Sequence, residues 1–224
     1  RTPALTKLHE QGVSLVISVD CGVSAVKEVR EAHKMGLDII ITDHHAVPLE
    51  MPPALAVINP KRADSKYPFV DLAGVGVALK LRQALLLSLG KPSQADDVGD
   101  LVALGTIADM VPLLGENRAL VKAGLRQINA GPRLGIAEMM ARARLRSGGV
   151  DTEYVSWVLA PRLNAAGRME HALSGYQLLL TRSTEEAREL VTWLEEKNTA
   201  RQELTARFSN MAKEQVQGKG VAPL

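Results

Sequence analysis

Four side chains that could bind a cation lie directly after apolar runs of this sequence. Asp20 ends the run VSLVISVD, and Asp43, His44 and His45 end and follow the run LDIIITD. Carboxylate oxygens combined with an imidazole suit Mn²⁺ or Mg²⁺ better than a metal that prefers thiolates. The spacing therefore predicts a divalent-metal site. The alternative is that Asp20 caps the following helix while the histidines bond to nearby backbone.

A third carboxylate, Asp109, lies in the stretch LGTIADMVPL. It follows an apolar segment and precedes Pro112, so we expect it at a helix end or in a turn. With Asp20 and His44 it would complete a mixed carboxylate and imidazole set. Cys21 adjoins Asp20, but no partner base is evident, so a small, partly buried cysteine is the simpler interpretation.

A second polar cluster occurs in APRLNAAGRM, residues 160–169. Arg162 and Arg168 flank Asn164 and several small residues. Small residues let the backbone approach a ligand closely, and arginine can grip a phosphate through two hydrogen bonds. The alternative is a surface turn with solvated arginines.

The elements that must position the metal site are short strands. Apolar runs rich in β-branched residues predict strands over 13–20, 37–43 and 54–60, with a helix over 24–36 that ends near Gly36. This order indicates a βαβ unit with a parallel sheet whose strands are buried on both faces. Because the carboxyl ends of parallel strands share an edge, Asp20 and His44 should lie together there.

The remainder of the chain is predicted to be mainly helical from Gly74 onward. The fold class is therefore α/β followed by a helical region and a long C-terminal connector helix, which begins with a capping box of Ser183 and Glu186. The expected domains are 1–182, comprising an α/β part (1–60) and a helical part (70–182), followed by a connector and tail (183–224).

Composition excludes several classes of protein. The chain has 224 residues, of which 46% are hydrophobic and 23% charged, with no apolar run long enough to span a membrane. A single cysteine excludes an intrachain disulfide, and there is no secretory signal, so we expect a cytoplasmic protein. A net charge of +2 is too small to indicate nucleic-acid binding by itself.

Five motifs in order resemble one known family. SVDCGVS, TDHH and LGTIADMVPL are similar to motifs of the DHH phosphoesterase superfamily, and DLAGVGVALKL and APRLNAAGRM resemble the RecJ exonucleases within it. The resemblance covers nearly the whole chain. It implies a two-metal phosphodiesterase that digests single-stranded DNA from the 5′ end in repair and recombination.

The resemblance also implies a role for each residue of the first cluster. Asp20 would bridge two divalent ions, Mn²⁺ or Mg²⁺, and His44 and Asp109 would ligate one of them. His45 would contact the scissile phosphate. Asp43 would not bind a metal ion itself but would orient the side chains of this cluster.

Further implications concern substrate and partners. Arg168, with Asn164 and Arg162, would hold the phosphate of single-stranded DNA, and protein partners would include single-strand-binding protein and recombination helicases. The family's first acidic motif, of the type DxDADG, is absent from these residues and is expected before residue 1. A second domain is expected after the long helix. The segment alone is therefore expected to be inactive, with one bound metal ion or none.

Two other functions remain open from the sequence. A DHH phosphoesterase could act on short oligonucleotides, cyclic dinucleotides or pyrophosphate, which a substrate panel would reveal. A DHH module without the first acidic motif could serve as a non-catalytic binding or scaffold unit.

Overall fold

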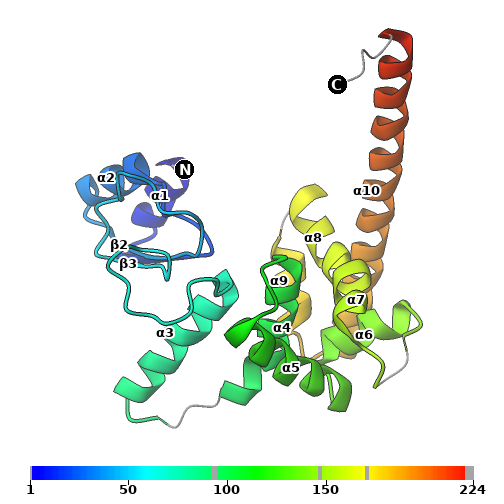
Figure 1. Cartoon of the computed structure of the whole chain (residues 1–224), viewed down its shortest axis with the longest axis horizontal. Coiled ribbons are helices and arrows are strands. Elements are labelled where there is room, and N and C mark those ends of the chain that lie inside the picture. Colours follow the sequence, from blue (N-terminus) through cyan, green and yellow to red (C-terminus); the bar gives the residue numbers. More distant parts are fainter. Residues whose placement is uncertain (1, 92–94, 146–147, 170–171, 220–224) are drawn as a thin grey trace. The chain divides into compact units, whose positions relative to one another are not determined.

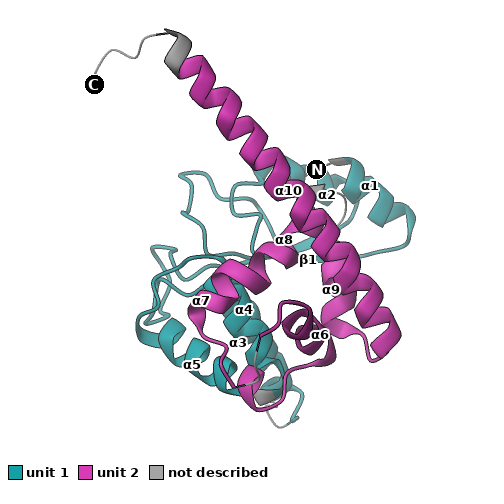
Figure 2. Cartoon of the chain, turned by 90° about the vertical axis from the view of Figure 1, so that its right-hand side faces the viewer, with its two compact units in different colours: residues 1–126 teal, residues 127–224 magenta. Residues whose placement is uncertain are grey.

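The computed structural model describes residues 2–91, 95–145, 148–169 and 172–219. The chain forms two compact units, residues 1–126 and 127–224, coloured teal and magenta in Figure 2. Each unit has its own packing, and helix α5 (Gly115–Ala130) continues from the first into the second. None of the helices in the described ranges has the length and apolar character needed to cross a membrane.

The first unit is built on a parallel sheet of three strands. These are β1 (Leu15–Val19), β2 (Asp38–Thr42) and β3 (Ala56–Ile58), hydrogen-bonded in the order β1-β2-β3. Val19 pairs with Thr42, and Thr42 pairs with Ile58, so the three strands end level with one another. The α/β class and the parallel βαβ unit predicted from the sequence are confirmed.

One face of this sheet carries the core of the unit. Helices α1 (Thr2–Glu10) and α2 (Val26–Lys34) bury it, with Val29 and Ala32 packed on Leu37, Ile39 and Ile41. The prediction of a glycine at the end of α2 is confirmed, because Gly36 has a φ of +76°, a conformation that suits glycine.

The expectation that the strands are buried on both faces is wrong for β1. Leu15, Ile17 and Val19 alternate along the strand and are 44%, 45% and 51% exposed. β1 and β3 are the two edge strands of the sheet, and Ile58 at the end of β3 is also 37% exposed. The fully buried apolar side chains of the sheet, Ile39 and Ile41, belong to the central strand β2.

The helical part of the first unit begins with α3 (Gly74–Ser88), which contacts both β1 and β2. A short 3₁₀ turn, η1 (Ala95–Val98), leads into α4 (Gly99–Ala108), which packs against α3. Asp109 is the C-cap residue of α4, so the prediction that it lies at a helix end is confirmed.

The second unit consists of helices packed against one long helix. They are α6 (Leu134–Arg142), α7 (Thr152–Tyr154), η2 (Val155–Leu159), α8 (Ala160–Met169) and α9 (Leu173–Leu180). The segment η2 is a π-helical turn that ends two residues before Pro161. Because proline cannot donate a backbone hydrogen bond and collides with a regular turn, the wider turn allows the helix to continue.

The long helix is α10 (Thr184–Lys219), which runs from orange to red in Figure 1. Ala187, Val191 and Leu194, spaced four and three residues apart, are buried on one side of α10, and α6, α8 and α9 contact this helix. Every described side chain from 202 to 216 is exposed, and this half extends beyond the other helices of the unit (Figure 2).

The predicted capping box at the start of α10 is half correct. The amide of Glu186 donates to the Ser183 hydroxyl at 3.2 Å. The Glu186 carboxylate instead bonds to the hydroxyl of Thr181, which also accepts from the Ser183 amide at 3.1 Å. Thr181 therefore replaces the reciprocal half of the motif.

Candidate metal centre

Asp20 is the first residue after β1 and has an unusual backbone conformation. Its φ is +62°, in the left-handed region that aspartate tolerates better than most residues. Its amide donates to the Thr42 carbonyl at 2.9 Å, which extends the pairing of β1 with β2 by one residue. The positive φ turns the chain out of the sheet directly after β1, so the Asp20 carboxylate lies at the carboxyl end of this strand.

Asp43 holds together the loops at the ends of β1 and β2. Its side chain is 1% exposed. Oδ2 accepts from the Val23 amide at 2.9 Å, and Oδ1 accepts from the amides of His44 and His45 at 2.7 and 3.1 Å. Oδ1 also lies 2.7 Å from Nδ1 of the His45 ring. This buried carboxylate therefore orients both histidines.

These contacts shift two pKa values in opposite directions. Burial alone would raise the pKa of Asp43, but hydrogen bonds from Val23, His45 and His44 together lower it. The hydrogen bond to Asp43 raises the pKa of His45 above its ordinary value, against the smaller effect of burial. Asp43 thus stays ionised, and a proton is favoured at Nδ1 of His45.

His44 lies between two carboxylates. Its Nε2 atom is 3.0 Å from Oδ1 of Asp20 and 3.2 Å from Oδ2 of Asp109. The residue is 5% exposed, and neither ring nitrogen makes a well-aligned hydrogen bond among the described residues, although Nε2 lies within ion-pair distance of both carboxylates. Buried polar atoms are normally satisfied, so Nε2 and the two carboxylates are available to a shared ligand. The structure thus brings the three predicted ligand side chains together.

The donor set fits a hard divalent cation. One donor atom each from Asp20, His44 and His45 lies within 4.8 Å of the other two. Two residues are therefore candidates for the third ligand. His45 lies near both other donor atoms, whereas Asp109 makes the direct contact with Nε2 of His44. We favour Asp109, because an exposed imidazole already bonded to Asp43 is better placed to meet a substrate. Whether Asp109 or His45 binds the ion stays a prediction.

The electrostatics of Asp20 agree with this fit. Burial raises the pKa of its carboxyl, and Asp109 adds to that rise while His44 and His45 oppose it. Two carboxylates close together repel each other, and a cation between them removes that repulsion. Asp20 does not cap α2, whose N-cap residue Ala25 makes no side-chain hydrogen bond. The capping alternative is therefore wrong.

Two residues that support the site were missed in the sequence. Asn59 is 4% exposed, and its Nδ2 donates to the His45 carbonyl at 3.0 Å. Gly74, the first residue of α3, lies so near Asp20 that a Cβ there would be 2.0 Å from Oδ1. In the sequence the pair Asn59-Pro60 indicates only the end of a strand. The small residues of the AGVG stretch could have predicted that this backbone approaches another group closely.

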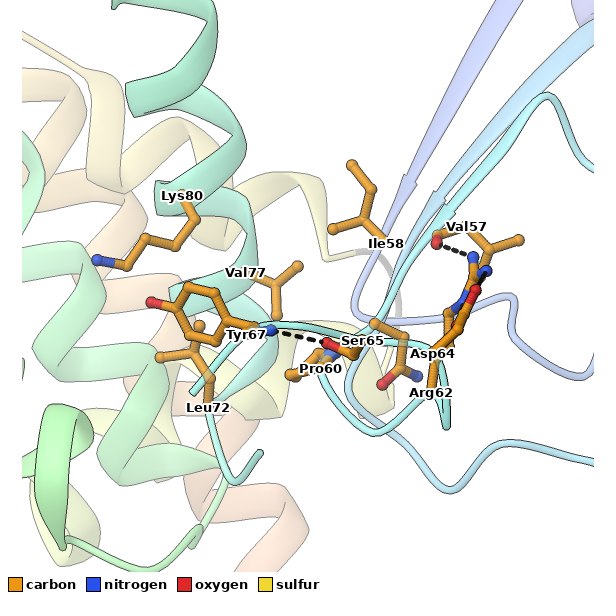
Figure 3. A pocket seen from close by; sticks show the side chains of 11 residues that line it. Val57, Ile58, Pro60, Arg62, Asp64, Ser65, Tyr67, Leu72, Val77 and Lys80 are labelled. Carbon is orange, nitrogen blue, oxygen red and sulfur yellow. Dashed lines mark hydrogen bonds and ion pairs between the residues drawn. The ribbon is translucent and has the colours of Figure 1, made fainter. Parts of the chain in front are cut away.

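Asn59 also lines a cavity of about 320 Å³. Figure 3 shows this cavity from close by. The Tyr67 ring and the Lys80 chain lie on one side of it, and Ile58 on another. The charged groups that line it form ion pairs with neighbouring residues: Lys80 with Glu116 at 2.5 Å, and Arg62 with Asp64. Its full lining is Val57, Ile58, Asn59, Pro60, Arg62, Asp64, Ser65, Tyr67, Leu72, Val77 and Lys80. The lining is mainly apolar, and its charged groups are neutralised in pairs.

The predicted phosphate contacts belong to the second unit, in helix α8. Arg162 is 17% exposed and binds Glu195 of α10 through two hydrogen bonds, of 2.6 and 3.0 Å. Its visible role is structural. Asn164 is exposed, and the side chain of Arg168 lies outside the described residues. Their role in phosphate binding stays a prediction, although the stretch is a helix and not a surface turn.

Cys21 is exposed and not partly buried as expected. Some desolvation of the sulfur nevertheless raises the pKa of the thiol, and the nearby charges of Asp43 and Asp20 raise it further. The reactive thiolate is therefore disfavoured, which agrees with a non-catalytic cysteine.

The sequence of the chain is similar to that of a known family. Residues 2–106 match the family described as the DHH family, N-terminal domain. The chain is 42% identical over 218 residues to the single-stranded-DNA-specific exonuclease RecJ of Bacillus subtilis, covering 97% of this chain and 27% of that protein. It is 38% identical over 207 residues to RecJ of Escherichia coli, covering 88% and 36% respectively.

Solved structures give the same result. RecJ of Thermus thermophilus in complex with Mn²⁺ matches with a TM-score of 0.81 at 36% identity, over 93% of this chain and 31% of that one. The Mg²⁺ complex matches with a TM-score of 0.66 at 30% identity, over 92% and 35%. The chain thus spans about a quarter to a third of the length of the curated relatives that it matches.

Proposed function

This chain belongs to the RecJ family of DHH proteins, and from that premise we propose that it forms part of a metal-dependent phosphodiesterase site. In the intact protein the site would remove nucleotides from the 5′ end of single-stranded DNA in the cytoplasm, during repair and recombination. The observation that carries the proposal is the convergence of two carboxylates on a buried imidazole whose Nε2 makes no well-aligned hydrogen bond within the described part of the chain.

Each side chain has a task in this proposal. Asp20, His44 and Asp109 would hold Mn²⁺ or Mg²⁺. A pair of such ions at a phosphodiester supplies a nucleophile at neutral pH and offsets charge on the leaving oxygen. His45, with 60% of its side chain exposed, would donate a hydrogen bond to the scissile phosphate. Asp43 would keep His45 in the orientation and protonation state that this contact requires.

Metal binding by the chain of 224 residues is the first test. We expect calorimetry to detect Mn²⁺ binding that Asp20→Asn and Asp109→Asn each weaken by at least tenfold. Asp38→Asn is the matched control, because Asp38 is an exposed aspartate at the opposite end of β2. Equal Mn²⁺ affinities for all four proteins would contradict the proposed site.

Activity is the second test. We expect the intact protein to digest 5′-phosphorylated single-stranded DNA and to spare a duplex and cyclic dinucleotides, whereas the 224-residue chain alone binds metal without hydrolysing DNA. Metal-dependent digestion by the chain alone, abolished by Asp20→Ala, would show that this expectation of inactivity is wrong. Preference of the intact protein for cyclic dinucleotides would assign it a different substrate class.

A further inference from the structure

Asn117 is a fully buried polar residue in the first turn of α5, with 0% of its surface exposed. Its Nδ2 atom donates to the carbonyl of Asp71 at 2.6 Å and to the carbonyl of Pro112 at 3.1 Å. Its Oδ1 atom accepts from the amide of Ala73 at 3.3 Å. One side chain therefore joins two loops that are about forty residues apart in the sequence.

The first loop, residues 71–73, lies next to Asp20 in space. Residues 71–73 run directly into Gly74, whose Cα faces the Asp20 carboxylate so closely that a Cβ would lie 2.0 Å from Oδ1. The first residue of α3 is therefore in close van der Waals contact with this carboxylate and limits its movement. A shift of residues 71–73 would displace Gly74 and give Asp20 room to turn away from His44.

The second loop leads to Asp109. Pro112 lies three residues beyond it, and Met110 between them has a φ of +57°. A strained backbone is kept only where its surroundings hold it. The hydrogen bond from Asn117 to the Pro112 carbonyl anchors the loop on the far side of this strained residue.

We propose that Asn117 is a positioning residue for the metal centre. Its amide fixes the Asp71–Ala73 loop and the Pro112 loop relative to one another, and thereby holds Asp20 and Asp109 at Nε2 of His44. This inference rests on the proposed function.

The chemistry of the residue explains why asparagine is needed. Its planar amide supplies two donors and an acceptor within a short side chain. Aspartate has the same shape, but when ionised it offers no donor and would face two carbonyl oxygens. Serine can make only one donor contact at a time.

The decisive variant is Asn117→Asp, and its control is Glu116→Gln. Glu116 is the preceding residue of the same helix turn, and it contacts the hydroxyl of Tyr67 at 2.6 Å and Nζ of Lys80 at 2.5 Å. Glu116→Gln therefore weakens the start of α5 while leaving both loops anchored. Mn²⁺ affinity, the electron paramagnetic resonance spectrum of bound Mn²⁺, and urea unfolding would be measured on the same 224-residue proteins.

We expect Asn117→Asp to lower Mn²⁺ affinity by ~10–100-fold and to change the spectrum of any ion still bound, as for other groups behind metal ligands. Glu116→Gln should lower the urea midpoint and leave Mn²⁺ affinity within about twofold of the unsubstituted value. Unchanged affinity for Asn117→Asp would overturn the inference. So would a loss of affinity that Glu116→Gln reproduces at an equal loss of stability, because Asn117 would then be merely structural.

Asn117→Ser replaces the aspartate variant if the latter does not fold, and it is judged by the same criterion. Asp20→Asn, measured in parallel, separates the two levels of the argument. If Asp20→Asn abolishes Mn²⁺ binding and the Asn117 variants do not affect it, only this inference fails. If Asp20→Asn has no effect, or the unsubstituted chain binds no Mn²⁺, the proposed function fails and this inference fails with it.

Discussion

Replacement of Gly74 by alanine should weaken metal binding. An alanine Cβ would lie 2.0 Å from Oδ1 of Asp20, whereas ordinary contact begins at 3.4 Å, so the carboxylate oxygen must retreat by at least 1.4 Å. Metal-ligand distances tolerate changes of only about 0.2 Å. Asp20 has room to move, because its side chain is 52% exposed, and the move would take it away from His44.

The same substitution should also cost some stability. The new Cβ would lie 2.6 Å from Cγ and 2.9 Å from Cβ of Asp20, so turning the carboxylate does not relieve the whole contact. We therefore expect Gly74→Ala to lower Mn²⁺ affinity at least ~10-fold and to cost ~1–3 kcal/mol of unfolding free energy without metal. Calorimetry and urea unfolding without metal measure the two quantities.

Gly135→Ala is the matched control, at a crowded helical glycine of the second unit, which holds none of the proposed metal ligands. Its Cβ would lie 2.0 Å from the carbonyl oxygen of Leu178, a contact that should also cost ~1–3 kcal/mol. Both variants are thus expected to lose stability, and only Gly74→Ala to lose Mn²⁺ affinity. Mn²⁺ binding by Gly74→Ala with the parent affinity would refute the close approach of α3 to Asp20.

Three further substitutions have defined outcomes. Burial would raise the pKa of Glu116, but its hydrogen bonds with Lys80 and Tyr67 lower it overall. Glu116 therefore contributes stability that is fully present above the ordinary glutamate pKa of 4.5 and is lost as the pH falls through its lower folded-state pKa. Glu116→Gln should remove about 1 kcal/mol of this dependence in urea unfolding at pH 3–6. Arg162→Lys should lower the melting temperature, because lysine cannot reproduce the two hydrogen bonds to Glu195; an unchanged value would count against that contact. Met110→Asn should add roughly 0.5–1 kcal/mol to the free energy of unfolding, because asparagine tolerates a φ of +57° better; a loss would contradict the assigned conformation.

The sequence was informative wherever one local rule was sufficient. The apolar runs before Asp20 and Asp43 located two neighbouring strands, and the parallel crossover placed their ends at one edge. The position of Asp109 at the end of α4 also followed from local pattern. Its approach to His44 did not, since that depends on how α3 and α4 pack. The residue types and the family resemblance indicated this grouping, but neither gave a structural reason for it.

The supporting residues show why local pattern is insufficient. Asn59 and Asn117 are polar residues in ordinary contexts, and what distinguishes them is the carbonyl groups that the fold brings to them. The exposure of Leu15 and Ile17 was missed for a related reason. An apolar β-branched run has the same sequence whether one face or both faces of its strand are covered.

The backbone conformations at the metal centre give an independent reason to regard it as the functional part of this chain. Within the described residues only three non-glycine residues have positive φ; one is Asp20 and another, Met110, follows Asp109. Each such conformation costs on the order of 1–3 kcal/mol and persists only if surrounding contacts enforce it. Here those contacts bring two carboxylates toward one imidazole, an arrangement that burial and like charge oppose at Asp20. Stability alone would not favour that arrangement, whereas a divalent cation shared by the three groups would compensate for both costs.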